Sequence, residues 1–398
     1  MQSLTILKRN DRYRDFLYSV FALYFIYSTD SLIVSLGTNR MVEYGSYAIL
    51  GVLSAIFLIN IMVRHHGQVL LDLFICLACV FASSLINLDR SLLGLIKSFC
   101  LVVGFYAATE MDQKRFIKAF IRMMTLIAVG SLVIYVMKDF LISLNVFPVL
   151  TGYKGQRFAN FFLANVRVNS TASFRNWGPF WEPGAYQAYL IVALLFLMFE
   201  DIDMKHKSLL ITIFVITLGT VMSTTGFLAI PFLLTAFLLS GSEHKKFLSL
   251  KVAIIIIVTG FMIWFVNSEY FAKIFTDKFE LGSELDRFMT VKYGLKLFLQ
   301  KPIFGYSSLY TVAFHEIVGQ SFSITNTYIA HLVVFGLVMG VLSIVLIYRF
   351  VRSYNKPFLI TFLMFLSLIV SFSGEKMIYC PLFSFMMFYQ ANRVHGIG

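Results

Sequence analysis

Charge is scarce in this sequence. Of its 398 residues only 14% are Asp, Glu, Lys or Arg, whereas 59% are hydrophobic. In a soluble domain the charged share is about a quarter, and a soluble chain of this size has too little interior to hide so much apolar surface. The composition therefore excludes an ordinary soluble globular protein. The mean hydropathy of +0.79 is typical of a protein embedded in a membrane.

Paired cysteines and a cleavable leader are also missing. The four cysteines, Cys76, Cys79, Cys100 and Cys380, all lie inside apolar runs. Cys76 and Cys79 form a C-x-x-C, but no second pair accompanies them, so we expect small buried residues and neither a metal nor a redox cofactor. The charged N-terminal stretch enters an apolar run without a small-residue cleavage site, which predicts a retained first helix.

What the sequence has in abundance is apolar runs of about twenty residues, which predict transmembrane helices. We expect an all-α, polytopic transmembrane helix bundle that forms a single integral membrane domain over residues 1–398. The twelve predicted spans are 16–36, 44–63, 69–87, 91–108, 117–137, 183–199, 207–221, 222–239, 250–267, 325–348, 357–373 and 376–390.

The basic residues predict the orientation of these spans. With the N-terminus inside, the cytoplasmic connections are rich in Lys and Arg, whereas the short outer ones hold only Arg40, Arg90 and Lys376. This pattern follows the positive-inside rule and places both termini in the cytoplasm, with the chain in the inner (cytoplasmic) membrane. The net charge of +12 has the same explanation. Because no aromatic–basic patch lies on a soluble domain, we expect no nucleic-acid partner.

Two connections, about 138–182 and 268–324, are much longer than the rest, and both fall on the outer face. Long connections are uncommon without a role. Both are basic, although the orientation bias disfavours this outside the cell, and an outer anionic ligand is the simplest explanation. Apolar positions from Leu285 to Phe298 recur at helical spacing in the second loop, so we expect short helices in these loops.

Three motifs follow one another in the second half of the chain. They are "FRNWGPFWEPG" (174–184), "MSTTGFLAI" (222–230), and "DRFMTVKYGLKLFLQKPIFGYSS" followed by "TNTYIAHLVVFGLVMGVL". The third carries Arg287, Pro302, Gly305, Asn326, Tyr328, Gly336 and Gly340 in order. From Arg175 to Leu342 the chain resembles the O-antigen polymerase and O-antigen ligase superfamily. The first five spans match it only in hydropathy.

The resemblance implies a metal-independent membrane glycosyltransferase that uses a glycan on undecaprenyl diphosphate at the outer face of the membrane. A polymerase transfers the growing glycan to the non-reducing end of another lipid-linked repeat unit, making O-antigen, capsule or exopolysaccharide; a ligase transfers it to lipid A core. Ligases place a histidine beside the asparagine of the third motif, where this chain has Thr325. We therefore favour the polymerase. Its partners would be an undecaprenyl-diphosphate-linked oligosaccharide, membrane lipids and a protein that regulates chain length.

Arg175 and Arg287 are the leading catalytic candidates, because each matches a motif of the superfamily and lies near the entrance of a span. A leaving diphosphate gains charge, and arginine stays protonated and binds phosphate oxygens in a bidentate manner. Arg157 and Arg167 are candidate substrate-binding residues, and a solvated loop charge is an equal alternative for each.

Glu182 precedes Pro183 and is the candidate base, although a substrate contact or a simple helix start would explain it as well. Trp181 would stack on a sugar or anchor the chain at the interface.

Three further candidates for substrate binding lie in the third motif region: His315, Asn326 and Tyr328. A lone loop histidine is more often merely exposed. Lys97, in the middle of a span, requires a carboxylate or a cavity; a structural pairing explains it better than a lipid phosphate.

Two other classes of function stay open. A transporter or flippase of lipid-linked sugars would show repeated halves and broken helices near the middle of the membrane. The sequence shows no internal repeat, and its charges cluster in the outer loops. A sensor or scaffold whose outer loops bind an anionic polymer is the third alternative.

Overall fold

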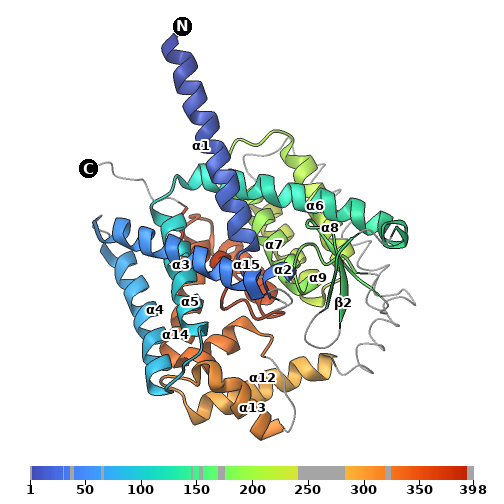
Figure 1. Ribbon diagram of the computed structural model, residues 1–398. Helices are drawn as coiled ribbons and strands as arrows, with labels where there is room; N and C mark the ends of the chain where they lie inside the picture. The colour runs from blue at the N-terminus through green and yellow to red at the C-terminus, as the bar shows by residue number, and fades with distance from the viewer. Residues whose placement is uncertain are drawn as a thin grey trace. The chain divides into compact units, whose positions relative to one another are not determined.

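The computed structural model describes nine stretches of the chain (Figure 1). They are residues 2–29, 31–35, 40–63, 67–144, 147–151, 156–168, 175–240, 283–318 and 324–391. The predicted span 250–267 and the part of the second outer loop before residue 283 lie outside the described residues.

Helices make up most of what is described, as predicted. Four of them are long and apolar enough to cross a membrane: α3 (Arg40–Val63), α4 (Gly67–Ile86), α6 (Gln113–Ser143) and α14 (Thr327–Arg352). Shorter apolar helices are α5 (Leu93–Thr109), α7 (Pro183–Phe199), α8 (Lys207–Val221), α9 (Thr224–Leu239) and α15 (Phe358–Phe372). The all-α class is thereby confirmed, while the count of twelve spans stays a prediction.

Capping residues set several helix starts. Asp112 accepts a hydrogen bond from the Arg115 backbone N–H at 3.1 Å and begins α6. Pro183 occupies the first turn of α7, where its missing N–H costs nothing. Asn326 begins α14 by accepting from two backbone N–H groups.

The chain divides into two compact units, described here in turn. The first consists of Met1–Gly67, Phe99–Ser223 and Tyr379–Ala391, and the second of Gln68–Ser98, Thr224–Ile378 and Asn392–Gly398.

In the first unit, α1 (Gln2–Tyr27) crosses α6 and packs against it, and α6 also contacts α7 and α8 (Figure 1). Residues Pro183 to Met198 of α7 are all buried, so α7 forms the centre of this unit. Two short helices complete it, α2 (Leu32–Ser35) against α3 and α16 (Pro381–Phe388) against α1.

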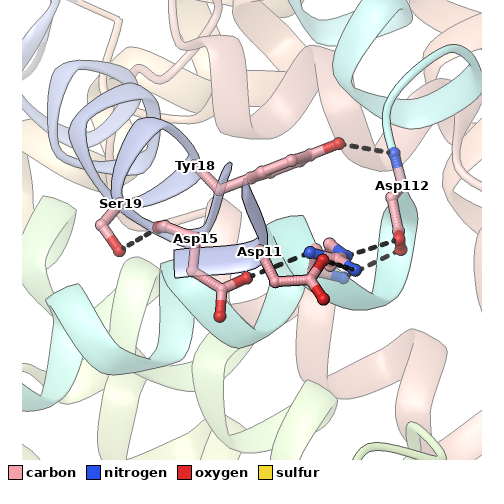
Figure 2. Close-up of polar contacts among 6 residues, drawn as sticks. Asp11, Asp15, Tyr18, Ser19 and Asp112 are labelled. Atoms are coloured by element: carbon pink, nitrogen blue, oxygen red, sulfur yellow. Dashed lines mark hydrogen bonds and ion pairs between the residues drawn. The ribbon is translucent and has the colours of Figure 1, made fainter. Parts of the chain in front are cut away.

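An arginine joins α1 to the start of α6. The guanidinium of Arg115 lies 2.9 Å from an oxygen of Asp11, 3.5 Å from Asp15 and 3.1 Å from Asp112 (Figure 2). In the same cluster the Asp112 backbone N–H donates to the Tyr18 hydroxyl at 3.0 Å. Together these bonds fix the middle of α1, from Asp11 to Tyr18, against the start of α6.

The first outer loop forms a sheet in its described part, where we predicted short helices. Strands β1 (Val149–Thr151), β2 (Arg157–Asn160) and β3 (Asn165–Arg167) pair antiparallel in the order β1-β2-β3. Phe158 pairs with Arg167, and Ala159 with Val166. Phe158 is buried against Leu32 and Trp177, and this tertiary cluster favours strands where local spacing gave no clear signal.

In the second unit, α9 lies along α15, and α12 (Ser283–Gln300) packs on α14. The short elements η3 (Ser307–Leu309) and α13 (Tyr310–Val318) follow α12. An ion pair of 2.6 Å between Arg349 and Asp72 joins α14 to α4.

Helix α14, predicted as one continuous span, is broken at Gly336, whose φ of 86° and ψ of −176° are not helical. The loop after α12 fills the break: the Tyr306 N–H donates to the Val333 carbonyl at 2.8 Å, and the Leu337 N–H donates to the Pro302 carbonyl at 2.7 Å. The Ser83 hydroxyl donates to the Val334 carbonyl at 2.7 Å. Because unpaired backbone groups are costly away from water, this loop makes the break tolerable.

Candidate functional site

The segment from Arg175 to Glu182, in the first unit, is held in place by asparagines. The Asn176 side chain donates to the hydroxyls of Ser131 on α6 and Thr220 on α8, both at 3.1 Å. Its backbone N–H donates to the Thr220 carbonyl at 2.9 Å. Asn176 therefore fixes the residue before it, Arg175, relative to two helices.

A tight turn follows at Gly178, whose φ of +53° favours glycine. A Cβ here would lie 2.6 Å from the Tyr186 ring, so the backbone passes closer to α7 than any other residue would permit. The Gly178 N–H donates to the Asn176 side chain at 3.0 Å, and its carbonyl accepts from the Asn165 N–H at 2.7 Å. These contacts fix the turn relative to α7 and β3.

Arg175 lines a small recess between α6, β3 and the segment that follows. The recess measures about 190 Å³ including space open to solvent. Its lining residues are Ser131, Ile134, Tyr135, Lys138, Ala164, Asn165, Val166, Arg175 and Asn176. The enclosed space within it is only about 10 Å³, which is room for roughly one water molecule and far less than a pocket for an organic ligand needs.

Two cations border this recess. Arg175 is half-buried, and its Nε donates to the Val221 carbonyl at 3.3 Å, which orients the guanidinium. Lys138, near the end of α6, is also half-buried and holds its ammonium 5.2 Å from the centre of the Tyr135 ring. None of the described residues that line the recess is acidic. The lining of the recess thus carries positive charge, which favours an anion.

Arg157 and Arg167 are not brought together. Phe158 faces Arg167 across the strand pair, so Arg167 shares a sheet face with Phe158, while Arg157 shares the opposite face with Ala159. Arg157 is exposed and Arg167 half-buried, and neither lines the recess. Their part in substrate binding stays a prediction.

Glu182 occupies the N-cap position of α7, with extended backbone angles and no side-chain capping bond. Its placement fits a helix start, and its role as a base is not tested. Trp181 is half-buried and packs on the cluster of Leu32, Phe158 and Trp177. Trp177 is only 3% exposed, so it is a core residue and offers no face to a sugar.

Arg287 lies in α12 of the second unit, and its side chain is outside what the structure describes. Its catalytic role therefore stays a prediction.

Two of the three candidates in the third motif region, Asn326 and Tyr328, have structural contacts. The Asn326 side chain caps α14 by accepting from the N–H groups of Tyr328 at 3.0 Å and Ile329 at 3.1 Å. Tyr328 is buried, and its hydroxyl donates to the Leu368 carbonyl at 3.5 Å. His315 is exposed on α13. A substrate role for these three residues is not needed to explain their positions.

Lys301, one of the basic residues of the second outer loop, serves the fold. Its ammonium donates to the Asn87 side chain at 2.9 Å and lies 4.7 Å from the centre of the Tyr306 ring. The basic character of that loop is therefore only partly available to an external anion.

Sequence reasoning missed a carboxylate that binds the segment after α12. Asp89, in the connection between α4 and α5, accepts from the hydroxyls of Ser307 at 2.6 Å and Ser308 at 2.7 Å. Partial burial alone would raise the pKa of Asp89, but these hydrogen bonds lower it below the usual carboxyl range. The only available signal was an aspartate directly after a predicted span.

Thr327, His331 and the segment after α15 form a buried cluster of polar contacts. The Thr327 hydroxyl donates to the Glu375 carbonyl at 2.5 Å and accepts from the Met377 N–H at 2.9 Å. The Nδ1 of His331 lies 2.9 Å from the Thr327 carbonyl, and Lys97, fully buried on α5, interacts electrostatically with His331. The pairing of Lys97 with a carboxylate stays a prediction.

Across the described stretches, no group of three His, Cys, Asp or Glu side chains is arranged to hold a metal ion. Comparison with protein-family models, curated proteins and solved structures finds no match to this chain.

Proposed function

We propose that this chain is a membrane glycosyltransferase that polymerises lipid-linked oligosaccharide repeat units. The observation that carries the proposal is the recess at Arg175: a half-buried guanidinium, oriented by the Val221 carbonyl, shares an electropositive hollow with Lys138. The positive charge of this lining supports an anionic group of the substrate at its mouth. The order of the three motifs resembles that of the O-antigen polymerase and ligase superfamily, and this resemblance supports undecaprenyl diphosphate as the carrier of the glycan.

In the proposed reaction the glycosidic bond between the growing glycan and undecaprenyl diphosphate breaks, and the non-reducing-end hydroxyl of a second lipid-linked repeat forms the new bond. The hydroxyl proton leaves to a base, for which Glu182 is the candidate. The leaving diphosphate gains negative charge, and a cation already fixed beside it stabilises the transition state by about 3 kcal/mol. Twelve spans, cytoplasmic termini and an inner-membrane location belong to the same proposal.

A lipid-linked sugar transporter is the second candidate, because α14 is broken at Gly336 and transporters use broken helices at their substrate sites. In this chain, however, the residues Pro302 and Tyr306 fill the break with backbone hydrogen bonds. A break occupied by the protein itself supports transport less than an open one would. A ligase is the closest variant of the main proposal, and Thr325 beside Asn326 favours the polymerase over it.

The test uses purified protein in nanodiscs with a synthetic undecaprenyl-diphosphate repeat unit. We expect a ladder of products whose initial rate falls about 100-fold in Arg175→Ala, since removal of one fixed transition-state donor costs that much. Arg122→Ala is the matched control, because Arg122 is an exposed arginine on α6, and it should polymerise at the wild-type rate.

The other possible outcomes would each contradict a different part of the proposal. Undiminished ladders in Arg175→Ala would remove Arg175 from the site. Transfer to lipid A core without ladders would replace the polymerase by the ligase. Movement of the lipid-linked unit across a vesicle membrane with no new glycosidic bond would establish the transporter instead.

A further inference from the structure

The turn that joins β2 to β3 is apolar, although it belongs to the first outer loop. Phe161, Phe162 and Leu163 follow one another there, and Phe162 is 50% exposed. We propose that this hairpin tip, residues 161–163, is re-entrant: it lies in the apolar layer of the membrane, where Phe162 contacts the acyl chains of the lipids. The inference goes beyond the proposed function and requires only that α6 crosses a bilayer.

Two helices of the first unit hold the hairpin tip. A Cβ at Gly130 of α6 would lie 2.5 Å from Cδ1 of Leu163, so Leu163 rests directly on that part of the helix. Tyr27, the last residue of α1, stacks on Phe162 with the ring centroids 4.9 Å apart, and its hydroxyl donates to the Phe162 carbonyl at 2.8 Å. The depth of the tip therefore follows from the depths of Gly130 and Tyr27.

The charged cluster at the start of α6 limits these depths. The carboxylates of Asp11 and Asp15 beside Arg115 are 59% and 48% exposed, so the cluster lies outside the apolar layer. Along the helix axes Gly130 is at most about 22 Å beyond Arg115, and Tyr27 about 18 Å beyond Asp15. Any tilt of the helices shortens both depths. Because the hydrocarbon core is about 30 Å thick, both residues lie at least about 8 Å short of its far edge.

The charge pattern of α6 places Gly130 inside the apolar layer. Between Arg122 and Lys138 the helix has no charged residue, and Gly130 is at the centre of this stretch. The exposed side chains of the stretch are all apolar: Leu126, Val129, Val133, Val136 and Met137. An exposed apolar face on a helix long enough to cross a membrane faces lipid. Leu163 therefore packs beside the lipid-facing part of α6.

The backbone of the tip is suited to surroundings without water. The Phe161 N–H donates to the Ala164 carbonyl at 2.9 Å, and the Leu163 N–H donates to the Phe161 carbonyl at 2.8 Å. The Phe162 N–H donates to the Asn160 side chain at 3.0 Å. All three N–H groups of the tip are thus bonded within the hairpin. Lipid requires such pairing, because it offers no partner to a backbone group.

The backbone conformation of Phe162 points the same way. Its φ of +65° is rare for a bulky residue. Glycine or asparagine would adopt this conformation at a lower cost, and a turn in water favours them. In the apolar layer a polar side chain is costly, whereas a phenylalanine ring is at home among acyl chains.

The charged residues of the hairpin lie at its open end. Arg157 and Arg167 flank a stretch without charge that contains the tip. Arg157 is about 16 Å from Phe162 along an extended strand. This length, together with the long side chains, brings both arginines to the polar interface while the tip lies in the apolar layer.

The experiment places a photocrosslinking residue in the full-length protein in nanodiscs. The test variant is Phe162→p-benzoylphenylalanine, which keeps an aromatic ring. The same substitution at Val133, on the lipid-facing side of α6, is the positive control. At Thr151, exposed and paired with Arg157 at the open end of the sheet, it is the negative control. Melting temperatures close to that of the wild type show that the variants fold.

Mass spectrometry after irradiation counts the lipid adducts, and fragmentation locates the new bond on the lipid. We expect acyl-chain adducts at position 162 in a yield close to that at position 133 and at least about fivefold above that at position 151. Adducts at position 133 with none at position 162 would overturn the proposal. Bonds to headgroups at position 162, or to a second copy of the chain or another protein, would overturn it as well.

A second measurement does not depend on the photocrosslinker. Phe162→Trp adds a fluorophore to the three tryptophans of the wild type. Lipids brominated on their acyl chains should quench the emission that this variant adds. Added emission that resists these lipids but is quenched by a water-soluble quencher would place the tip in water and refute the insertion.

Discussion

Substitution of Gly336 by alanine tests whether the break in α14 is built into the fold. The φ of 86° and ψ of −176° at Gly336 lie in a region that is essentially restricted to glycine. A Cβ at this position would overlap the carbonyl group of Ile303, which belongs to the loop that fills the break. Alanine therefore forces either a strained backbone or removal of the loop from α14.

The expected cost follows from these two effects. Glycine-only backbone angles and overpacking against backbone atoms together cost about 2–6 kcal/mol. We expect the apparent melting temperature of the detergent-solubilised protein to fall by at least about 5 °C, measured by the fraction that stays monodisperse after heating. The polymerisation proposed above should fall as well, because the loop joins α12, which carries the candidate residue Arg287, to α14.

Gly45→Ala is the matched control for Gly336→Ala. Gly45 lies in α3, and a Cβ there meets no atom within 4 Å. Alanine at this position should leave the melting temperature unchanged or raise it slightly, because helices favour alanine over glycine by about 1 kcal/mol. A Gly336→Ala protein with wild-type melting temperature and activity would refute the reasoning about the filled break.

Two further predictions concern charged residues in the second unit that are at least partly buried. Because hydrogen bonds lower the pKa of Asp89, its carboxylate stabilises the fold above the ordinary carboxyl pKa of about 3.9, and this stabilisation is lost as the pH falls below that value. Asp89→Asn should therefore melt below the wild type at pH 7 but approach it at pH 3; parallel pH profiles would contradict this. Arg349→Met leaves the Asp72 carboxylate, only 11% exposed, without its partner and should cost about 3 kcal/mol. Asp72→Leu combined with Arg349→Met should recover much of that loss in a thermal melt, whereas additive losses would show that the pair is not coupled.

Hydropathy predicted the helices well, because burial of apolar runs in a membrane depends on the run itself and little on distant residues. The predicted spans 183–199 and 207–221 coincide with α7 and α8. Asn326 was chosen as a substrate contact from its motif, yet asparagine before an apolar run is also an N-cap signal, and the structure uses it so.

Features that depend on distant parts of the chain were not predictable in this way. The break at Gly336 requires a loop more than thirty residues earlier in the sequence, and a glycine within an apolar run gives no hint of it. The β-sheet of the first outer loop likewise depends on Phe158 meeting Trp177 and Leu32.

The recess was likewise predictable only in part. Arg175 was selected from its motif, and the structure places it at an electropositive hollow. Lys138 was missed because we ended the span at residue 137, whereas α6 continues to Ser143. Its proximity to the recess comes from the packing of the first outer loop against the end of α6.

The cluster at Arg115 has a consequence for how the protein is assembled. Under the proposed orientation, Arg115 is one of the charges that keep the start of α6 in the cytoplasm during insertion, a step in which acidic residues count for little. In the folded protein Asp11, 104 residues earlier in the chain, binds the same guanidinium. Arg115 thus acts first as an orientation signal and afterwards as the ion-pair partner that holds α1 against α6. The ion pair can form only after α6 has been synthesised. The orientation of α1 is therefore set earlier, by the basic residues of α1 itself.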